Sequence, residues 1–104
     1  MNISQEIREG WCVVHPQGRA DTQTADELQA ALIAAASEHP RVALDLAELD
    51  YISSAGLRAV LLGARAAQQH GAEFVVCAAS PGVREVFEIS CMNRLMQMQE
   101  ALPC

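Results

Sequence analysis

The chain has 104 residues, of which 51% are hydrophobic and 19% are charged, and this balance and length predict a single globular domain over residues 1–104. Thirteen acidic residues against seven basic ones give a formal net charge of −6, and all seven basic residues are arginines. The absence of lysine excludes a Walker A nucleotide loop, a Schiff-base enzyme and an S-x-x-K acyl transferase. The acidic charge argues against nucleic acid and anionic membranes as partners, so we expect a protein partner.

The chain is expected to begin with two strands joined by a tight turn. Residues 3–8 and 11–15 have strand-like sequences, and Glu9-Gly10 between them suits the turn. Pro16-Gln17-Gly18 is expected to close the second strand, because proline and glycine commonly end regular structure.

A first helix is predicted over residues 22–37. Its apolar residues recur at helical spacing, and they are Ala25, Leu28, Leu32 and Ala35. At its start, Thr24 and Glu27 match a capping box, in which both side chains bond backbone N–H groups that the first turn leaves free. His39-Pro40 ends the helix, because the residue before a proline disfavours helical backbone angles.

The middle of the chain predicts a strand, a helix and another strand. Residues 41–46 suit a short strand, 47–52 a turn and 54–69 a second helix. The apolar face of that helix comprises Leu57, Val60, Leu61, Ala64 and Ala67. Gly71 suits the left-handed position after a helix. Residues 73–78 form a nearly continuous apolar run, typical of a strand covered on both faces.

A third helix is predicted to start with Ser80 as its cap and Pro81 in its first turn. In the tail, residues 95–98 are compatible with one more strand. The resulting order is β-β-α-β-α-β-α, with or without a last strand. This alternation predicts an α/β layered domain, in which helices pack on a mixed, mostly parallel sheet of four to five strands.

Targeting signals are absent from the sequence. Residues 1–10 are polar, unlike a signal peptide, and no apolar run approaches the roughly 18 residues of a membrane-spanning helix. We therefore expect a cytoplasmic protein with no membrane contact. The four cysteines, which form no C-x-x-C pair, are Cys12, Cys77, Cys91 and Cys104. Buried, reduced thiols are the favoured interpretation, with a disulfide or metal role as the alternative.

The segment richest in chemical information is Leu49–Leu57 (LDYISSAGL), at a predicted strand-to-helix junction. Ser53 or Ser54 should lie at or next to the N-cap, with its hydroxyl near unpaired backbone N–H groups. Gly56 in the first turn costs about 1 kcal/mol relative to alanine, which favours a close approach by another group; tight packing of small residues is the alternative. A phosphate on one of these serines would be tolerated at a helix N-terminus, and would add about −1.5 to −2 charges.

Three segments of the chain resemble motifs of one protein family. Asp50–Arg58 (DYISSAGLR) resembles the signature of STAS domains, specifically of the bacterial anti-sigma factor antagonists. Gly18–Asp21 (GRAD) is similar to the family's G-x-L-D turn before its first helix, with alanine in place of leucine. Ser80–Glu88 (SPGVREVFE) resembles the family's S-P-x-V helix start. The resemblance covers residues 3–99 and implies a STAS fold.

The resemblance also implies a phosphorylation site. In the family, a partner anti-sigma factor that is also a serine kinase phosphorylates the serine two residues before the signature glycine, which is Ser54 here. Ser53 stands where the family often has aspartate, and is the less favoured candidate for phosphorylation. The residues expected to bind the partner are Asp21, Thr22, Tyr51, Ser53, Ser54, Gly56 and Arg58.

The mechanism that the resemblance implies is partner switching. The unphosphorylated protein binds the kinase, an ATPase of the GHKL type, which then releases its client, a sigma factor or another regulator. Phosphorylation at Ser54 breaks this complex, and a PP2C-like phosphatase restores it. The chain itself is expected to be no enzyme and to bind no cofactor and no metal.

Two other classes of function stay open as alternatives. A serine hydrolase would need a G-x-S-x-G elbow or its equivalent and a nearby histidine, but nothing in the sequence ties the three histidines to Ser54. They are His15, His39 and His70. A STAS domain can also be an accessory subunit of a transporter ATPase or a small-ligand-binding module, and these share the signature with the antagonists.

Overall fold

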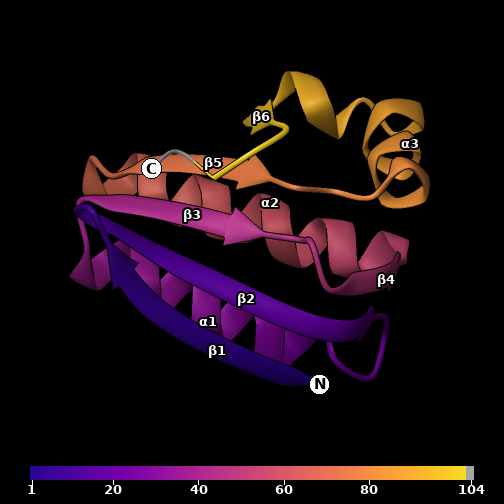
Figure 1. Cartoon of the computed structure of the whole chain (residues 1–104), viewed down its shortest axis with the longest axis horizontal. Helices are drawn as coiled ribbons and strands as arrows, with labels where there is room; N and C mark the ends of the chain where they lie inside the picture. Colours follow the sequence, from indigo (N-terminus) through magenta and orange to yellow (C-terminus); the bar gives the residue numbers. More distant parts are fainter. Residues whose placement is uncertain (103–104) are drawn as a thin grey trace.

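The structure is a computed structural model that describes residues 1–102, and its centre is a six-stranded sheet (Figure 1). The strands are β1 (Asn2–Arg8), β2 (Trp11–Ala20), β3 (Arg41–Asp45), β4 (Leu49–Ile52), β5 (Glu73–Cys77) and β6 (Gln97–Gln99). Five follow the order β1-β2-β3-β5-β6, and β4 pairs with the far end of β2. Among the strand pairs within residues 1–102, only β1–β2 is antiparallel. The mixed, mostly parallel α/β sheet is confirmed, with six strands where four to five were predicted.

Helices cover one face of this sheet. α1 (Ala25–Glu38) and α2 (Ser54–His70) lie behind the strands in Figure 1, while the face toward the viewer has no helix over β2 and β3. α3 (Pro81–Ile89), followed by a 3₁₀ turn at Met92–Arg94, lies beyond the end of β5 and contacts β4. No helix within residues 1–102 is long and apolar enough to cross a membrane.

The hairpin forms as predicted, but β2 is longer than its sequence suggests. Glu9 and Gly10 have φ of 50° and 85°, the left-handed angles of a two-residue turn between twisted strands. The prediction that Pro16 closes the second strand is wrong, since β2 continues to Ala20. Pro16 is tolerated because β3 pairs with β2 only at residues 12–14 and β4 only at 18–20. The N–H that proline lacks would therefore have had no strand partner on that side.

The first helix starts later than predicted, at Ala25, and the capping box is absent. The Thr24 hydroxyl donates to the Arg19 carbonyl at 2.7 Å and accepts from the Asp21 N–H at 2.9 Å, so it makes no cap bond to the helix. The Thr24 hydroxyl that a capping box would use is thus bonded to the loop before the helix. The predicted apolar face is buried, and the helix ends at Glu38, before His39-Pro40, as expected.

Two further segments refine the prediction. The segment 47–52, expected as a turn, contains strand β4, whose first and last residues are buried and whose middle residues are exposed. The additional strand that the tail allowed is present as β6, three residues long. The caps of the later helices are as predicted: Gly71 follows α2 with φ of 72°, and the Ser80 hydroxyl accepts from the Val83 N–H at the start of α3.

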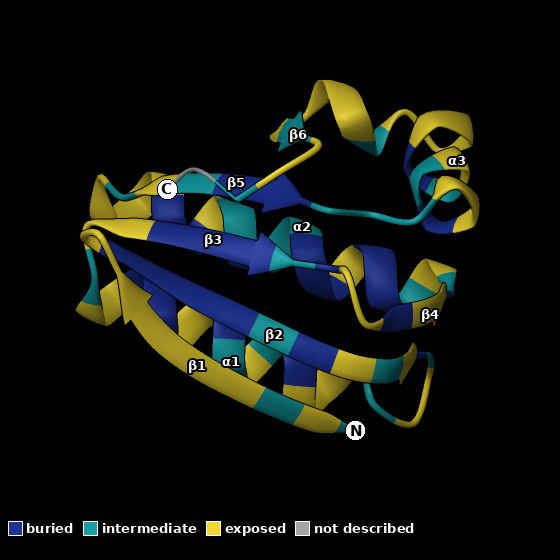
Figure 2. Ribbon diagram, viewed as in Figure 1, coloured by how far each residue is buried: buried dark blue, intermediate teal, exposed yellow. Residues whose placement is uncertain are grey.

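Buried residues run along β2, β3 and β5 in the middle of the sheet (Figure 2). They form two clusters, one on each side of the sheet. Side chains alternate along β2, so that Cys12 and Val14 pack toward the helices, while Trp11 and Val13 pack on the other face. Cys12 and Cys77 are both buried, as predicted, but on opposite faces, so they cannot bridge each other. Cys91 is exposed, and Cys104 lies outside the described residues.

Candidate functional site

The ends of β2 and β4 bring together two segments that were singled out separately in the sequence. Ala20 and Ile52 are partners in the parallel register, and the Ser53 N–H donates to the Ala20 carbonyl at 2.8 Å. Asp21 and Ser53 therefore leave the sheet side by side, at the edge where parallel strands end. Ligand and partner sites of α/β folds commonly use this edge.

The two adjacent serines at the start of α2 have different surroundings. Ser53 is the N-cap, and its hydroxyl accepts from the Gly56 N–H at 3.3 Å. Ser54 is the first residue of the helix and is exposed. Within residues 1–102, its hydroxyl has no hydrogen-bond partner. The Ser53 hydroxyl is thus engaged in holding the helix, while the Ser54 hydroxyl is open to an incoming group.

Gly56 is buried in the first turn of α2. A Cβ at this position would lie 2.6 Å from the Ala20 carbonyl oxygen and 2.8 Å from Cγ1 of Ile52. The close approach expected at this glycine is therefore an approach to the protein's own strands, which is the tight-packing alternative. Gly56 lets α2 start directly against the ends of β2 and β4, and this contact positions both serines.

The turn before α1 holds the second predicted contact segment. Asp21 Oδ1 accepts from the Gln23 N–H at 3.0 Å, and its backbone carbonyl accepts from the Ala25 N–H at 2.9 Å. Asp21 is half-buried and Thr22, in the same turn, is exposed. The aspartate thus fixes the turn through short-range bonds of the kind that Asx turns use, and the turn lies beside the start of α2.

Tyr51 is half-exposed at 41% and packs under an arginine that the sequence reasoning missed. The Arg19 guanidinium lies 4.2 Å from the centroid of the Tyr51 ring, and Arg19 Nε lies 3.8 Å from Asp21 Oδ2. Arg19 and Tyr51 are register partners of β2 and β4. Because residues 49–52 were predicted as a turn, no signal in the sequence linked the two residues. Beyond Tyr51 is a cavity of about 200 Å³, lined by Asp50, Tyr51, Ile52, Gly82, Val83 and Val86.

A larger, open groove of about 500 Å³ begins at the Ser54 side of α2. It is lined by Ser54, Ala55, Leu57, Arg58, Leu61, Ser90 and Met92. Arg58 follows Ser54 by four residues, and residues at this spacing are neighbours on a helix surface. Among the predicted contact residues, the groove therefore joins Ser54 and Arg58, and its apolar lining comes from α2 and the turn after α3.

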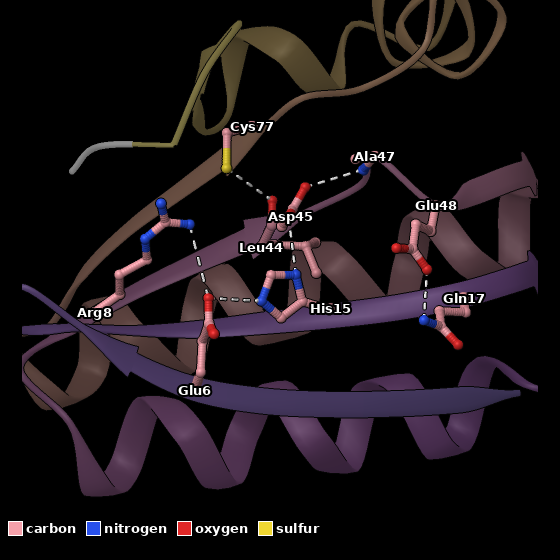
Figure 3. A network of polar contacts seen from close by, with 9 residues as sticks. All are labelled: Glu6, Arg8, His15, Gln17, Leu44, Asp45, Ala47, Glu48 and Cys77. Carbon is pink, nitrogen blue, oxygen red and sulfur yellow. Dashed lines mark hydrogen bonds and ion pairs between the residues drawn. The ribbon is translucent and has the colours of Figure 1, made fainter.

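The three histidines lie on other parts of the fold, and His39 follows the last residue of α1. His15 lies on the helix-free face (Figure 3), with Nδ1 2.8 Å from Asp45 Oδ2 and Nε2 3.3 Å from Glu6 Oε1. His70 ends α2, at the opposite end of the helix from Ser54. Within residues 1–102, no group of three or more His, Cys, Asp or Glu side chains is arranged to hold a metal ion.

Comparison with known proteins assigns this fold to a family. The sequence profile of the STAS domain matches residues 2–103. The chain belongs to the STAS domain family. A relative, BtrV of Bordetella bronchiseptica, is named as a candidate anti-sigma factor antagonist; it is 45% identical over 91 residues, which are 86% of this chain and 78% of BtrV.

Solved structures share the STAS fold. An anti-sigma factor antagonist from Mycobacterium paratuberculosis superposes with a TM-score of 0.87 at 22% identity, over 97% of this chain and 86% of that protein. The Bacillus cell fate determinant SpoIIAA in its phosphorylated form gives a TM-score of 0.74 at 19% identity, over 98% of this chain and 93% of SpoIIAA. The family and the fold expected from the three sequence motifs are confirmed.

Proposed function

We propose that this STAS protein is an anti-sigma factor antagonist controlled by phosphorylation of Ser54. In its unphosphorylated form it binds an anti-sigma factor that is also a GHKL-type serine kinase, and this releases the kinase's client. The observation that carries the proposal is the exposed, unbonded Ser54 hydroxyl beside the engaged Ser53 hydroxyl. The relatives support it, since BtrV is named as a candidate antagonist and SpoIIAA was solved in a phosphorylated form.

The chemical step needs only a hydroxyl from this chain. Ser54 Oγ forms a bond to the γ-phosphorus of ATP, the bond to the β-phosphate oxygen breaks, ADP leaves, and the hydroxyl proton passes to a base of the kinase. The kinase supplies the ATP and the catalytic groups, so the STAS chain is a substrate and not an enzyme. Because ATP is a cytoplasmic metabolite, the proposal assigns the protein to the cytoplasm.

The proposed contact surface surrounds Ser54. Its members are Asp21, Thr22, Tyr51, Ser53, Ser54 and Arg58. Gly56 stays in the proposal as a packing residue, because it is buried against Ala20 and cannot itself touch a partner. The groove beside Ser54 and Arg58 adds an apolar surface that the partner can cover.

Release of the partner follows from charge. The chain carries a net charge of −6, with Asp21 directly after β2 and Asp50 in β4, the strand that leads into α2. A phosphate on Ser54 adds about −1.5 to −2 charges to this surface. Its own helix tolerates it at the N-terminus, whereas an interface built around a neutral hydroxyl loses contacts and gains repulsion. A PP2C-like phosphatase reverses the change.

The test is phosphate transfer from ATP by the cognate serine-kinase anti-sigma factor, located by mass spectrometry of peptides. Wild type and Ser53→Ala are expected to incorporate phosphate at residue 54, and Ser54→Ala is expected to incorporate none. Circular dichroism of each variant verifies that it is folded. Equal incorporation into Ser54→Ala and wild type, or exclusive modification of Ser53, would overturn the proposal.

A further inference from the structure

The outer edge of the sheet at β1 is long and open. β1 is the terminal strand of the sheet, seven residues long, and pairs only with β2 along Asn2–Arg8. Protein edges are usually protected by proline, by charged side chains, by a bulge or by a covering element. β1 has no proline, no lysine and no bulge in its register with β2, and its two charged side chains, Glu6 and Arg8, lie 3.8 Å from each other. α1 contacts β2 and β3, and every residue of β1 except Ile3 is exposed.

The hairpin determines which backbone groups face outward. A two-residue turn closes on a hydrogen-bonded pair, here Arg8 and Trp11, and hydrogen-bonded and non-bonded pairs then alternate. Ile3, opposite Pro16, therefore falls in a non-bonded pair. Pro16 supports this assignment independently, because a proline has no N–H and cannot complete a hydrogen-bonded pair. The backbone N–H and C=O groups of Ile3, Gln5 and Ile7 thus point away from β2, into solvent.

The sequence of β1 is complementary to itself in the antiparallel direction. Placing Gln5 of one copy opposite Gln5 of another pairs Ile3 with Ile7, and it aligns all the outward-facing backbone groups. The remaining opposed pairs are Asn2 with Arg8 and Ser4 with Glu6, so no two like charges face each other. Shifting the register so that Gln5 faces Ile7 places Glu6 directly opposite Glu6, which is repulsive. Charge therefore disfavours this shifted register relative to the one centred on Gln5.

Burial gives a reason for this pairing. Ile7 is 65% exposed, while Ile3 packs partly against the core on the helix side of the sheet. In the self-paired register, Ile7 of each copy lies opposite Ile3 of the other and loses water-exposed apolar surface. On the other face, Glu6 is already engaged by His15 and Arg8, at 3.3 and 3.8 Å, so its charge is partly balanced.

We propose that β1 is a homodimerisation edge: two copies of this chain join antiparallel through their β1 strands, centred on Gln5, to form one continuous sheet. The single strand pair makes a small interface, so the dimer is weak and depends on concentration. This inference does not depend on the phosphorylation of Ser54.

The test combines sedimentation velocity with amide hydrogen exchange on the full chain. Between about 10 μM and about 1 mM, a range suited to weak association, the mean mass should rise from 11.2 kDa toward twice that value. The amides of Ile3, Gln5 and Ile7 should gain protection over the same range. The amides of Ser4, Glu6 and Arg8, which bond β2, should be protected at every concentration.

Two variants locate the interface. Gln5→Pro removes an outward N–H without touching a β1–β2 bond, and Ile7→Lys places a charge opposite Ile3; both should abolish the mass increase. Ile89→Lys, an equivalent change at a 75% exposed isoleucine on α3, should leave it unchanged. Urea unfolding verifies that each variant is folded. A monomer at every concentration with the amides of Ile3, Gln5 and Ile7 unprotected, or a dimer that survives both β1 substitutions, would overturn the proposal.

Discussion

Neighbouring serines at the start of α2 illustrate how position, more than residue type, determines a role. The Ser53 hydroxyl satisfies the Gly56 N–H, a donor that the first helical turn would otherwise leave free. Ser54, one residue later, points its hydroxyl to solvent. The sequence alone left both serines as candidates at the cap, because cap assignment depends on where helical backbone angles begin.

Alanine at each serine should separate the two roles. Ser53→Ala is expected to lower the free energy of unfolding by about 1 kcal/mol, the usual loss of a helix cap. Ser54→Ala should change it by less than about 0.5 kcal/mol, as expected for an exposed side chain without a partner. Urea denaturation followed by circular dichroism measures both. Equal destabilisation by the two substitutions would contradict the assigned cap.

Gly56 has a packing role that a glycine comparison can isolate. Gly56→Ala should lower the free energy of unfolding by about 1–3 kcal/mol, because the new methyl would overlap the Ala20 carbonyl and force the helix away from the strands. Gly82→Ala is the matched control, since this first-turn glycine of α3 has no atom within 4 Å of the added Cβ. It should stabilise the fold by up to about 1 kcal/mol through helix propensity. Denaturation midpoints decide between the two outcomes.

Cys12 should make stability fall at alkaline pH. Burial raises the pKa of its thiol above the ordinary value of 9.0, and Glu38 adds to the rise. The folded state therefore holds this proton more tightly than the unfolded state. The resulting stabilisation is complete below pH 9.0 and is lost as the pH rises from there through the folded-state pKa.

This dependence can be measured by urea unfolding between about pH 8 and about pH 10. The free energy of unfolding of wild type should decrease over this range, and Cys12→Ala should show a smaller decrease. Cys91→Ala, at an exposed cysteine, is the control and should keep the wild-type slope. Identical slopes in all three proteins would contradict the raised pKa of Cys12.

At the scale of elements, periodicity predicted the helices and the central strands, and failed where pairing decides. Residues 49–52 do not alternate, since Leu49 and Ile52 are buried and the two residues between them are exposed. Only the long-range partner, the end of β2, makes them a strand. The extension of β2 past Pro16 was missed for the same reason. A proline usually ends a strand, but it is tolerated where no neighbouring strand would bond its N–H. Whether that holds at Pro16 depends on where β3 and β4 pair with β2.

The side-chain contacts on the helix-free face could not be predicted from the sequence either, because they also join different strands. Asp45 ends β3, and one of its two partners lies on another strand. Its Oδ1 accepts from the Ala47 N–H at 3.0 Å, and its Oδ2 lies 2.8 Å from His15. This pair ties β2 to β3 across the open side of the sheet.

Removing that tie should weaken the sheet. Asp45→Ala is expected to lower the free energy of unfolding by about 1–3 kcal/mol, because the partly buried His15 ring and the Ala47 N–H both lose a partner. Glu48→Ala, at an exposed acid that contacts Gln17, is the control and should change it by less than about 0.5 kcal/mol. Thermal unfolding of both variants measures the difference. A loss at Glu48 equal to that at Asp45 would show that net charge, and not the His15 contact, is responsible.

For the whole molecule, the fold could be predicted from local sequence motifs, whereas the arrangement of the site depends on long-range strand pairing. The sequence motifs predicted the STAS fold and the start of α2, because helix-start chemistry is local. The convergence of Asp21, Tyr51 and Arg19 on that start was not fully predictable, since it requires the parallel pairing of β2 with β4. Nor could the sequence show that Gly56 packs directly against Ala20.

Net charge also belongs to this scale. The protein already carries a net charge of −6, so a single phosphate changes the total charge only modestly. Its effect on partner binding must therefore come from its position. We therefore predict that the position of the phosphate, and not the total charge, controls the complex. The fold itself should be unaffected, because the first turn of a helix accommodates an anion.

The most direct test is the affinity of the cognate serine-kinase anti-sigma factor for two forms of the protein, measured by calorimetry. One form carries serine at position 54 and the other carries phosphoserine introduced during translation, with phosphoserine at position 37, exposed near the end of α1, as the control for charge. We predict that phosphoserine at position 54 lowers the affinity for the kinase by about tenfold or more, and that the control leaves the affinity unchanged. Equal affinity of the serine and phosphoserine forms at position 54 would contradict the switch.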